Sequence, residues 1–380
     1  MASNAAPLFS ASSAPSADNA GRAADYRKAT MQERDSTALR ADCTLAAKFW
    51  ACIHSALTAI TYREKGEEAA KQLWVLLMRQ HQKRFYLRGA HKLGIRDDEP
   101  PAVRAAKYHY LSNVIDNHEM EYIEETPRKV WIRYKAPKTT YAGVTMIALP
   151  GSISRAASTA WYPKNGILMG SSRLGFVSTK LMMEFEACDE GYFIEYEHDL
   201  APGEEYRFEH VTQTPEFDPS KAPRLDPELW PEERRLKARR NWSLEYVRTT
   251  VDCLFQMFGQ QTTCFLVSQV MRGIAIQLTH ELKRDIGIEG TDASSVTDFL
   301  YCLQRACGQS VQLTESQSAH RIHLRSHLPF KANVSEPLRA AMFEFTVMAA
   351  RVLNGRISVT RVPDGQAEFW EISNTGRWLW

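Results

Sequence analysis

The residues best suited to chemistry lie in an acidic stretch of the chain, between positions 184 and 209. Ten carboxylates fall in this stretch against one basic residue, and His198 and His210 lie in or beside it. A carboxylate next to an imidazole can orient and deprotonate a water molecule, and the same side chains can bind a divalent metal ion. A solvated strand edge with its loop has this composition too, so both interpretations stay open.

Four residues are our candidates for acid–base catalysis. Glu195 lies on a predicted strand over residues 191–197, and His198 and Asp199 follow directly after it. His118 begins a neighbouring strand region, from which its side chain could approach the same place. These side chains meet only if the two strands are neighbours in one sheet.

Three further residues are candidates for substrate binding. Trp161 and Tyr162 stand side by side before Pro163 in a predicted loop, where they offer apolar area and a polar group to a flat polar ring. Cys188 lies at a predicted turn, which could expose its thiol. The two acids that follow it would raise the pKa of this thiol, so an unreactive cysteine is the favoured interpretation.

No cofactor can be assigned from the sequence. It contains neither a glycine-rich phosphate loop with its lysine nor a Gly-x-Gly-x-x-Gly step after a strand, so a nucleotide is not indicated. The cysteines lack the Cys-x-x-Cys spacing of zinc and redox sites. A divalent metal bound by histidine and carboxylate side chains stays open, and its ligands are unknown.

Composition limits the classes of protein. The chain has 380 residues, 44% of them hydrophobic, with 47 Lys and Arg against 45 Asp and Glu, a formal net charge of +2. This balance argues against a nucleic-acid partner. No apolar run reaches the roughly 18 residues of a membrane span, no secretory signal is recognisable, and seven scattered cysteines are typical of reduced thiols. We therefore expect a cytoplasmic protein with a small-molecule substrate and no membrane partner, and self-association into a homo-oligomer stays open.

Periodicity predicts two similar domains joined by a linker. Residues 1–38 lack a periodic apolar face and are expected to be a disordered tail. Helices and then strands are predicted over 39–212, and the same order recurs over 233–380. Between them, over 213–232, prolines fall every four residues, which excludes a regular helix. Each domain is expected to be a helical layer packed on a small antiparallel sheet, so the predicted fold class is α+β.

Local matches indicate that the two halves are duplicated copies of one domain. Two pairs of tripeptides share an offset of 193 positions: Leu77-Met78-Arg79 with Val270-Met271-Arg272, and Leu93-Gly94-Ile95 with Ile286-Gly287-Ile288. After a one-residue slip, Pro137 falls on Pro329. The first half then holds about twelve extra residues, including Trp161, which favours it as the half that binds the ligand. Chance agreement between two amphipathic helix–strand units is the alternative.

These elements resemble a known fold. The segments from Leu93-Gly94-Ile95 to Lys135-Ala136-Pro137 and from Ile286-Gly287-Ile288 to Pro329 resemble the vinyl-reductase-type ligand-binding fold and, within it, the family of L-2-amino-thiazoline-4-carboxylate hydrolase. The resemblance implies a small-molecule pocket between helices and sheet and, in the hydrolase, the opening of a small heterocycle by water. Many relatives carry a cysteine before the proline that ends the central strand. This chain has Ala136 and Leu328 at those places, so no catalytic residue is carried over.

Two functions are therefore expected. The first is that of a hydrolase acting on cyclic C–N bonds of a small polar heterocyclic or amide-like substrate, in catabolism. The alternative is a non-catalytic small-molecule-binding or sensory protein, because one fold can serve both roles. A third hypothesis is a subunit that acts only together with a protein partner. Its contact surface would be the proline-rich linker and the basic cluster after it, which contains Arg234, Arg235, Lys237, Arg239 and Arg240.

Overall fold

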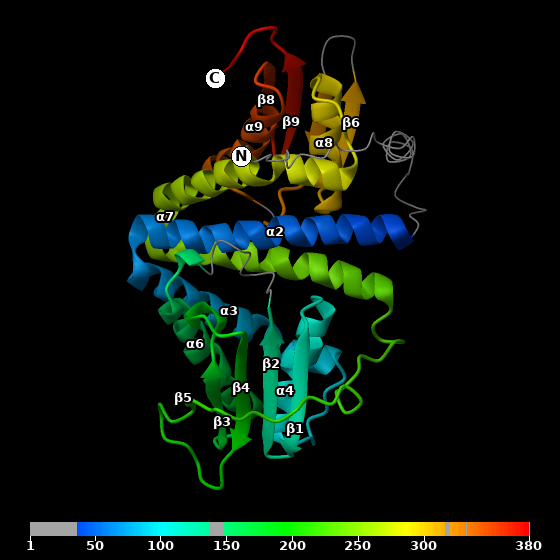
Figure 1. Cartoon of the computed structure of the whole chain (residues 1–380). Coiled ribbons are helices and arrows are strands. Elements are labelled where there is room, and N and C mark those ends of the chain that lie inside the picture. Colours follow the sequence, from blue (N-terminus) through cyan, green and yellow to red (C-terminus); the bar gives the residue numbers. More distant parts are fainter. Residues whose placement is uncertain (1–35, 137–146, 316–319, 332, 380) are drawn as a thin grey trace, which may run out of the picture.

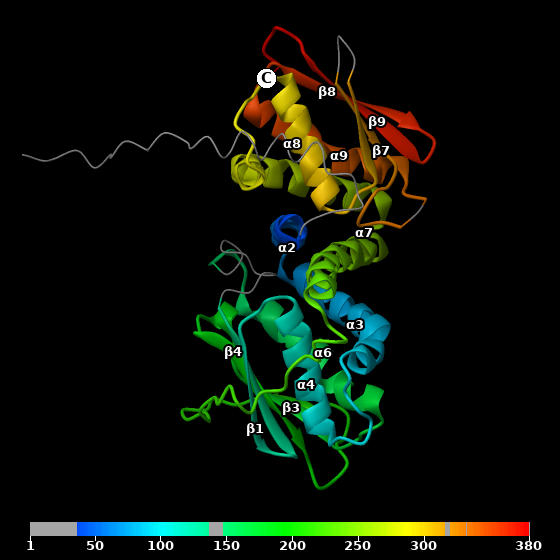
Figure 2. The same cartoon turned by 90° about the vertical axis from the view of Figure 1, so that its right-hand side faces the viewer.

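Two units, each with one small sheet, lie on either side of a central layer of long helices (Figure 1). The central layer contains α2 (Ser36–Lys65) and α7 (Glu232–Ile286), and α2 seen end-on lies between the two units (Figure 2). This mixture of helices and two small sheets confirms the predicted α+β class. The computed structural model describes residues 36–136, 147–315, 320–331 and 333–379.

In the first unit, α4 (Pro101–Ile115) and α6 (Gly151–Met169) cover one face of a five-stranded sheet, and α3 (Glu67–Lys92) packs over α6. The strands follow the order β1-β2-β4-β3-β5; β5 is parallel to β3 and the other pairs are antiparallel. The short helix η1 (Met182–Glu184) joins β3 to β4. The strand bounds are β1 (Met120–Thr126), β2 (Lys129–Lys135), β3 (Leu174–Lys180), β4 (Cys188–Glu195) and β5 (Tyr206–Phe208).

The second unit has the same arrangement with four strands. Its helices α8 (Ala293–Ala306) and α9 (Glu336–Leu353) cover an antiparallel sheet of order β6-β7-β9-β8. In both units the order along the chain is helix, two strands, helix, two strands, and the four strands have the same spatial order. The strand bounds are β6 (Val311–Glu315), β7 (His320–Leu324), β8 (Ile357–Asp364) and β9 (Ala367–Asn374).

Both long helical segments bend at a glycine. Gly66 separates α2 from α3 with φ 84° and ψ 178°, and Gly259 interrupts α7 with φ 72° and ψ −179°. A positive φ of this kind is open to glycine but strained for residues with a Cβ atom. The two glycines lie 193 positions apart, the offset of the tripeptide matches. α7 is thus two helices, over 232–258 and 260–286, which correspond in order to α2 and α3.

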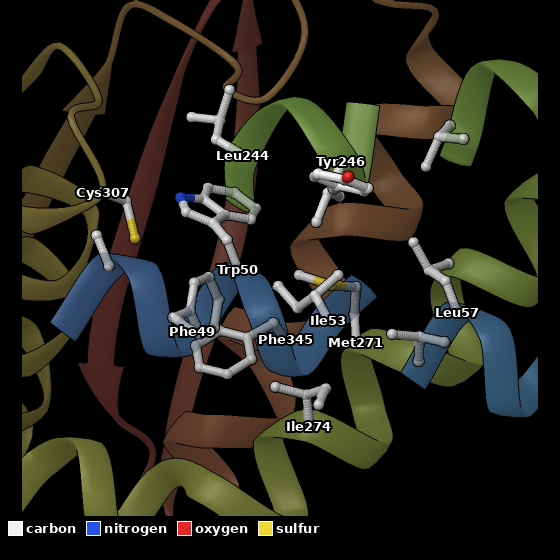
Figure 3. Packing of buried hydrophobic residues seen from close by; sticks show 14 of the residues in the cluster. Phe49, Trp50, Ile53, Leu57, Leu244, Tyr246, Met271, Ile274, Cys307 and Phe345 are labelled. Carbon is white, nitrogen blue, oxygen red and sulfur yellow. The ribbon is translucent and has the colours of Figure 1, made fainter. Parts of the chain in front are cut away.

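The first helix of each half packs against the opposite unit. Phe49 of α2 makes an edge contact with Phe345 of α9, with ring centroids 5.0 Å apart, and Figure 3 shows Trp50 beside them. In the first unit, Tyr246 of α7 stacks on His81 of α3 at 4.4 Å. α2 therefore completes the core of the second unit, and the first part of α7 completes the core of the first.

The segment between the units, residues 209–231, forms neither helix nor strand. It crosses the outer face of the first sheet (Figure 1), where Val211 packs against the buried pair Trp131 and Tyr192. Further along, Thr214 Oγ1 accepts a hydrogen bond from Arg133 Nη2 at 3.1 Å. The first part of this segment is therefore a strap fastened to the sheet.

Among the described helices, α2 is long and apolar enough to span a membrane by length and composition. However, 72% of its most apolar window is buried inside the protein. This burial follows from its position between the two units, and a core helix passes the same test of length and composition.

Candidate functional site

A cavity of about 130 Å³ lies inside the first unit, and we call it the aromatic cavity. It is bounded by the inner face of the sheet, by α3, α4 and α6, and by the first part of α7. A cavity of roughly 150 Å³ can hold benzene, so this one suits a small flat ring. Its walls carry mainly aromatic side chains, among them Trp74, Tyr108, Trp161, Tyr162, Phe176, Trp242 and Tyr246.

The inner face of the sheet forms the floor of the cavity. Alternation along β2 turns Ile132 and Tyr134 toward the helices, where both are buried. Opposite Ile132, β4 carries Gly191. A Cβ atom at this position would lie 2.4 Å from the carbonyl oxygen of Val177 and 2.5 Å from the ring of Phe176. Only glycine therefore fits here, and its missing side chain leaves room for the aromatic wall.

His109 of α4 is held at both ring nitrogens. The indole N–H of Trp161 can only donate, and it lies 3.1 Å from His109 Nε2, so this nitrogen accepts. Gln82 Nε2 donates to Asn165 Oδ1 at 2.6 Å, which turns the Asn165 amide nitrogen toward the same His109 nitrogen, at 2.9 Å. In the neutral ring the proton is then on Nδ1, which donates to the Tyr134 hydroxyl at 3.0 Å.

The chain of hydrogen bonds continues from Tyr134 to Tyr162. Because Tyr134 accepts from His109, its own proton goes to the Tyr162 hydroxyl, with which it is hydrogen-bonded. Burial raises the pKa of both phenols, and the charge of Asp189 adds to this effect. Both phenols are therefore protonated at neutral pH, and the Tyr162 O–H is the last donor of the chain. It can donate to an acceptor on a bound molecule.

A buried ion-pair network lies at the end of the sheet next to the cavity. Thr179 Oγ1 donates to Glu190 at 2.8 Å, and Arg133 Nε and Lys180 Nζ lie 2.6 and 3.1 Å from its carboxylate. Burial alone would raise the pKa of Glu190, but these three partners outweigh it and the pKa is lowered. Asp189 accepts from a backbone N–H at 2.7 Å. Both carboxylates are thus engaged in structural bonds.

The structure brings three of the predicted site residues together at the aromatic cavity. Trp161 and Tyr162 line it from α6, and the ring of Tyr162 stacks on Phe176 at 3.8 Å. His118 also lines it, with its Nε2 atom 3.0 Å from Asp116 Oδ2. Trp161 and Tyr162 come from α6, and His118 comes from the segment between α4 and β1.

Glu195, His198 and Asp199 are not brought to this cavity. The residues of β4 that line the cavity are Asp189, Glu190 and Gly191, whereas Glu195 is the last residue of the strand. His198 and Asp199 are exposed on the loop after it. Six steps along a strand span about 20 Å, so the expected convergence with His118 is wrong.

Two local predictions are corrected. Trp161 and Tyr162 lie within α6, not in a loop, although Pro163 follows them inside the helix. Proline disfavours a helix interior, but here the packing of the buried helix face outweighs that preference. Both units carry a helix at this place, so the expected contrast between a loop in one and a helix in the other is absent.

Cys188 was predicted to lie at a turn that could expose its thiol. Instead it is the first residue of β4 and is 6% exposed, and this burial raises the pKa of its thiol.

Sequence reasoning missed several residues that define the cavity. Tyr134 and Gly191 carry a signal, because the alternation of β2 predicts which face is buried. Trp242 and Tyr246 carry none, because they belong to the other half of the chain and reach the cavity through the exchanged part of α7.

Within the described ranges, no three His, Cys, Asp or Glu side chains are grouped as a metal site would require. No protein-family model, curated protein sequence or solved structure matches this chain.

Proposed function

We propose that this chain binds a small, flat molecule in the aromatic cavity and that this molecule accepts a hydrogen bond. The observation that carries the proposal is the chain of hydrogen bonds through His109 and Tyr134, which ends at the Tyr162 hydroxyl. The neighbouring rings of Phe176 and Trp161 supply apolar area. A ring that bears a carbonyl group matches both features. The proposal is that of a binding or sensory protein.

Hydrolysis in this cavity stays a prediction. A general base needs a lone pair that can take a proton from water. The Nε2 lone pair of His109 already accepts from Trp161 and Asn165, and Glu190 is bonded to cationic partners on the sheet. These contacts favour ligand binding in the cavity over the activation of a water molecule for hydrolysis. The resemblance to the hydrolase family, the cytoplasmic location and self-association stay predictions as well.

Benzamide, a flat ring with a carbonyl acceptor, is a suitable probe for the cavity. We expect saturable binding to the full chain by calorimetry. Tyr162→Phe keeps the ring but removes the last donor, so benzamide should bind about fivefold more weakly, the equivalent of one hydrogen bond of about 1 kcal/mol. Binding of benzene, which needs no donor, should stay the same. Equal weakening of both probes would contradict the role of the hydroxyl.

Two neighbouring alanines on α6 provide matched variants. Ala157 lines the cavity, so Ala157→Leu should fill it and abolish benzamide binding, whereas Ala156→Leu should leave binding intact. His198→Ala and Asp199→Ala should also leave it intact. Unchanged binding in Ala157→Leu would place the probe elsewhere. If the wild-type chain releases benzoate and ammonia from benzamide, and Ala157→Leu does not, the hydrolase prediction is supported instead.

We also infer that the two units arose by internal duplication. The shared strand order, the bends at Gly66 and Gly259, and the positive φ of Gly94 and Gly287 support it. Pro137, the counterpart expected for Pro329, lies outside the described residues. The second unit has a cavity of only about 40 Å³, lined by Met271, the counterpart of Met78 in the aromatic cavity. This difference in volume supports ligand binding in the first unit.

A further inference from the structure

A second hollow lies between α3 and the first part of α7, and we call it the α3–α7 groove. Its volume is about 280 Å³, and mainly apolar side chains line it. Trp230 and Trp242 form one wall, and Tyr108 and Trp242 also line the aromatic cavity, so they separate the two hollows. α3 contributes side chains at the spacing of one helix face: His81, Phe85, Arg88 and Lys92.

His81 is a buried polar group at one end of this groove. The residue is 5% exposed, and among the described residues its Nδ1 atom has no hydrogen-bond partner. Its ring packs against Tyr246 and Trp242. Burial lowers the pKa of His81 to about 3, so the imidazole is uncharged at neutral pH. His81 Nδ1 is fully enclosed by protein, whereas Nε2 is not, so a hydroxyl group on a ligand in the groove can reach the imidazole at Nε2.

The other end of the groove is cationic. Arg88 and Lys92 are exposed at its rim, seven and eleven residues beyond His81 on the same helix. The first interval corresponds to about 10 Å along the helix axis. The Trp230 indole N–H donates to the Lys92 carbonyl oxygen at 3.0 Å, which fixes this wall of the groove. An anion is therefore favoured at the rim, away from the buried imidazole.

A carboxylate also lines the groove and helps to orient a ligand. Glu245 lies one helical turn from Trp242, which contacts His81, and it forms an ion pair with Arg248. Its negative charge opposes an anionic group at the inner end. The groove therefore distinguishes a neutral polar end from an anionic end.

We propose that the α3–α7 groove is a second binding site, for an aromatic carboxylate that carries a hydroxyl group at the far end of the molecule. The hydroxyl bonds to His81 Nε2, and the carboxylate binds Arg88 and Lys92. The rings of Trp230 and Trp242 pack against the aromatic part along their wall of the groove. This site is additional to the aromatic cavity and requires no binding there.

The probe that tests the site is 3-(4-hydroxyphenyl)propionate, titrated into the full chain and followed by calorimetry. Two matched probes each lack one feature: 3-phenylpropionate lacks the hydroxyl, and methyl 3-(4-hydroxyphenyl)propionate lacks the charge. We expect the complete probe to bind at least about fivefold more tightly than either matched probe. If removal of either feature leaves affinity unchanged, or if the complete probe does not bind, the proposal is overturned.

Variants assign each feature to its residue. In His81→Phe the hydroxyl should lose its advantage, so the complete probe and 3-phenylpropionate should bind equally. In the double variant Arg88→Gln, Lys92→Gln, 3-(4-hydroxyphenyl)propionate should no longer bind more tightly than its methyl ester. His91→Phe and Arg79→Gln, at exposed positions of the same helix outside the groove, are the controls and should change neither comparison.

Ala157→Leu separates this site from the aromatic cavity. We expect the filled-cavity variant to bind 3-(4-hydroxyphenyl)propionate as the wild type does. If Ala157→Leu abolishes this binding, the probe occupies the aromatic cavity and the groove is not its site. Should His81→Phe fail to fold, the three probes with the unaltered chain still test the two recognition features.

Discussion

Phe49→Ala is expected to lower the free energy of unfolding by about 3–5 kcal/mol, although Phe49 belongs to the first of the described helices, α2. The side chain is 2% exposed, and its ring contacts those of Trp50 and Phe345 (Figure 3). Because Phe345 belongs to α9, the loss should appear in the second unit. Urea unfolding measures the size of the effect, and amide hydrogen exchange should show reduced protection in α9.

Phe265→Ala is the matched control for this experiment. Phe265 is 48% exposed on α7, so its truncation should change the free energy of unfolding by no more than about 0.5 kcal/mol. If Phe49→Ala reduced protection in the first unit and left α9 unchanged, the exchange of helices between the units would be wrong.

Arg133→Met should have an effect of similar size, because it leaves Glu190 buried beside the aromatic cavity with its main cationic partner removed. The Glu190 side chain is fully buried, and Arg133 also bonds to Glu121 and to Thr214 on the strap. Breaking a buried pair by removing one partner costs about 3–5 kcal/mol. Urea unfolding at neutral pH measures this loss, and adding Glu190→Gln should recover part of it.

The pH dependence of this variant follows from the pKa of Glu190. That pKa lies below its ordinary value of 4.5 in the folded protein. The carboxylate therefore stabilises the fold above the unfolded pKa, and this stabilisation is lost as the pH falls through the folded pKa. We expect the difference in unfolding free energy between Arg133→Met and the wild type to shrink as the pH is lowered below about 4.5. A difference that grows in acid would contradict the assigned ion pair.

Arg128→Met provides the exposed counterpart. Its ion pair with Glu197 spans 3.5 Å at the surface, with side chains 48% and 90% exposed. Surface pairs contribute about 0–1 kcal/mol, so this variant should be close to the wild type at every pH. A comparable loss in both variants would indicate that the net charge of the chain, rather than the buried network, is responsible.

Elements with a strong local pattern could be predicted from the sequence, and contacts between distant segments could not. Apolar spacing and alternation predicted helices and then strands in each half of the chain, and both halves contain them. The offset of 193 positions that relates Gly94 to Gly287 also relates Gly66 to Gly259. The helices bend at Gly66 and Gly259, and only the structure reveals these bends. The packing of α2 on the opposite unit has no local signature, because either unit could cover the same apolar face.

The candidate site was predicted in part. Trp161, Tyr162 and His118 lie at one cavity, although a proline next to the first two suggested a loop. His198 and Asp199 were chosen for their chemical types, but composition does not show which end of β4 faces the helices. That choice depends on which strand residues pack under α4 and α6, and this is a tertiary property.

The exchange of first helices has a consequence for chains half this length. A protein with one such unit would expose the apolar face of α2 around Phe49 and Ile53, which this chain buries against its other half. Such a protein could cover that face by exchanging helices with a second copy, in a two-fold dimer. The full chain is thus the covalent equivalent of that dimer. Joined by the strap, its halves stay paired one to one at any dilution, and each half is free to acquire a different cavity.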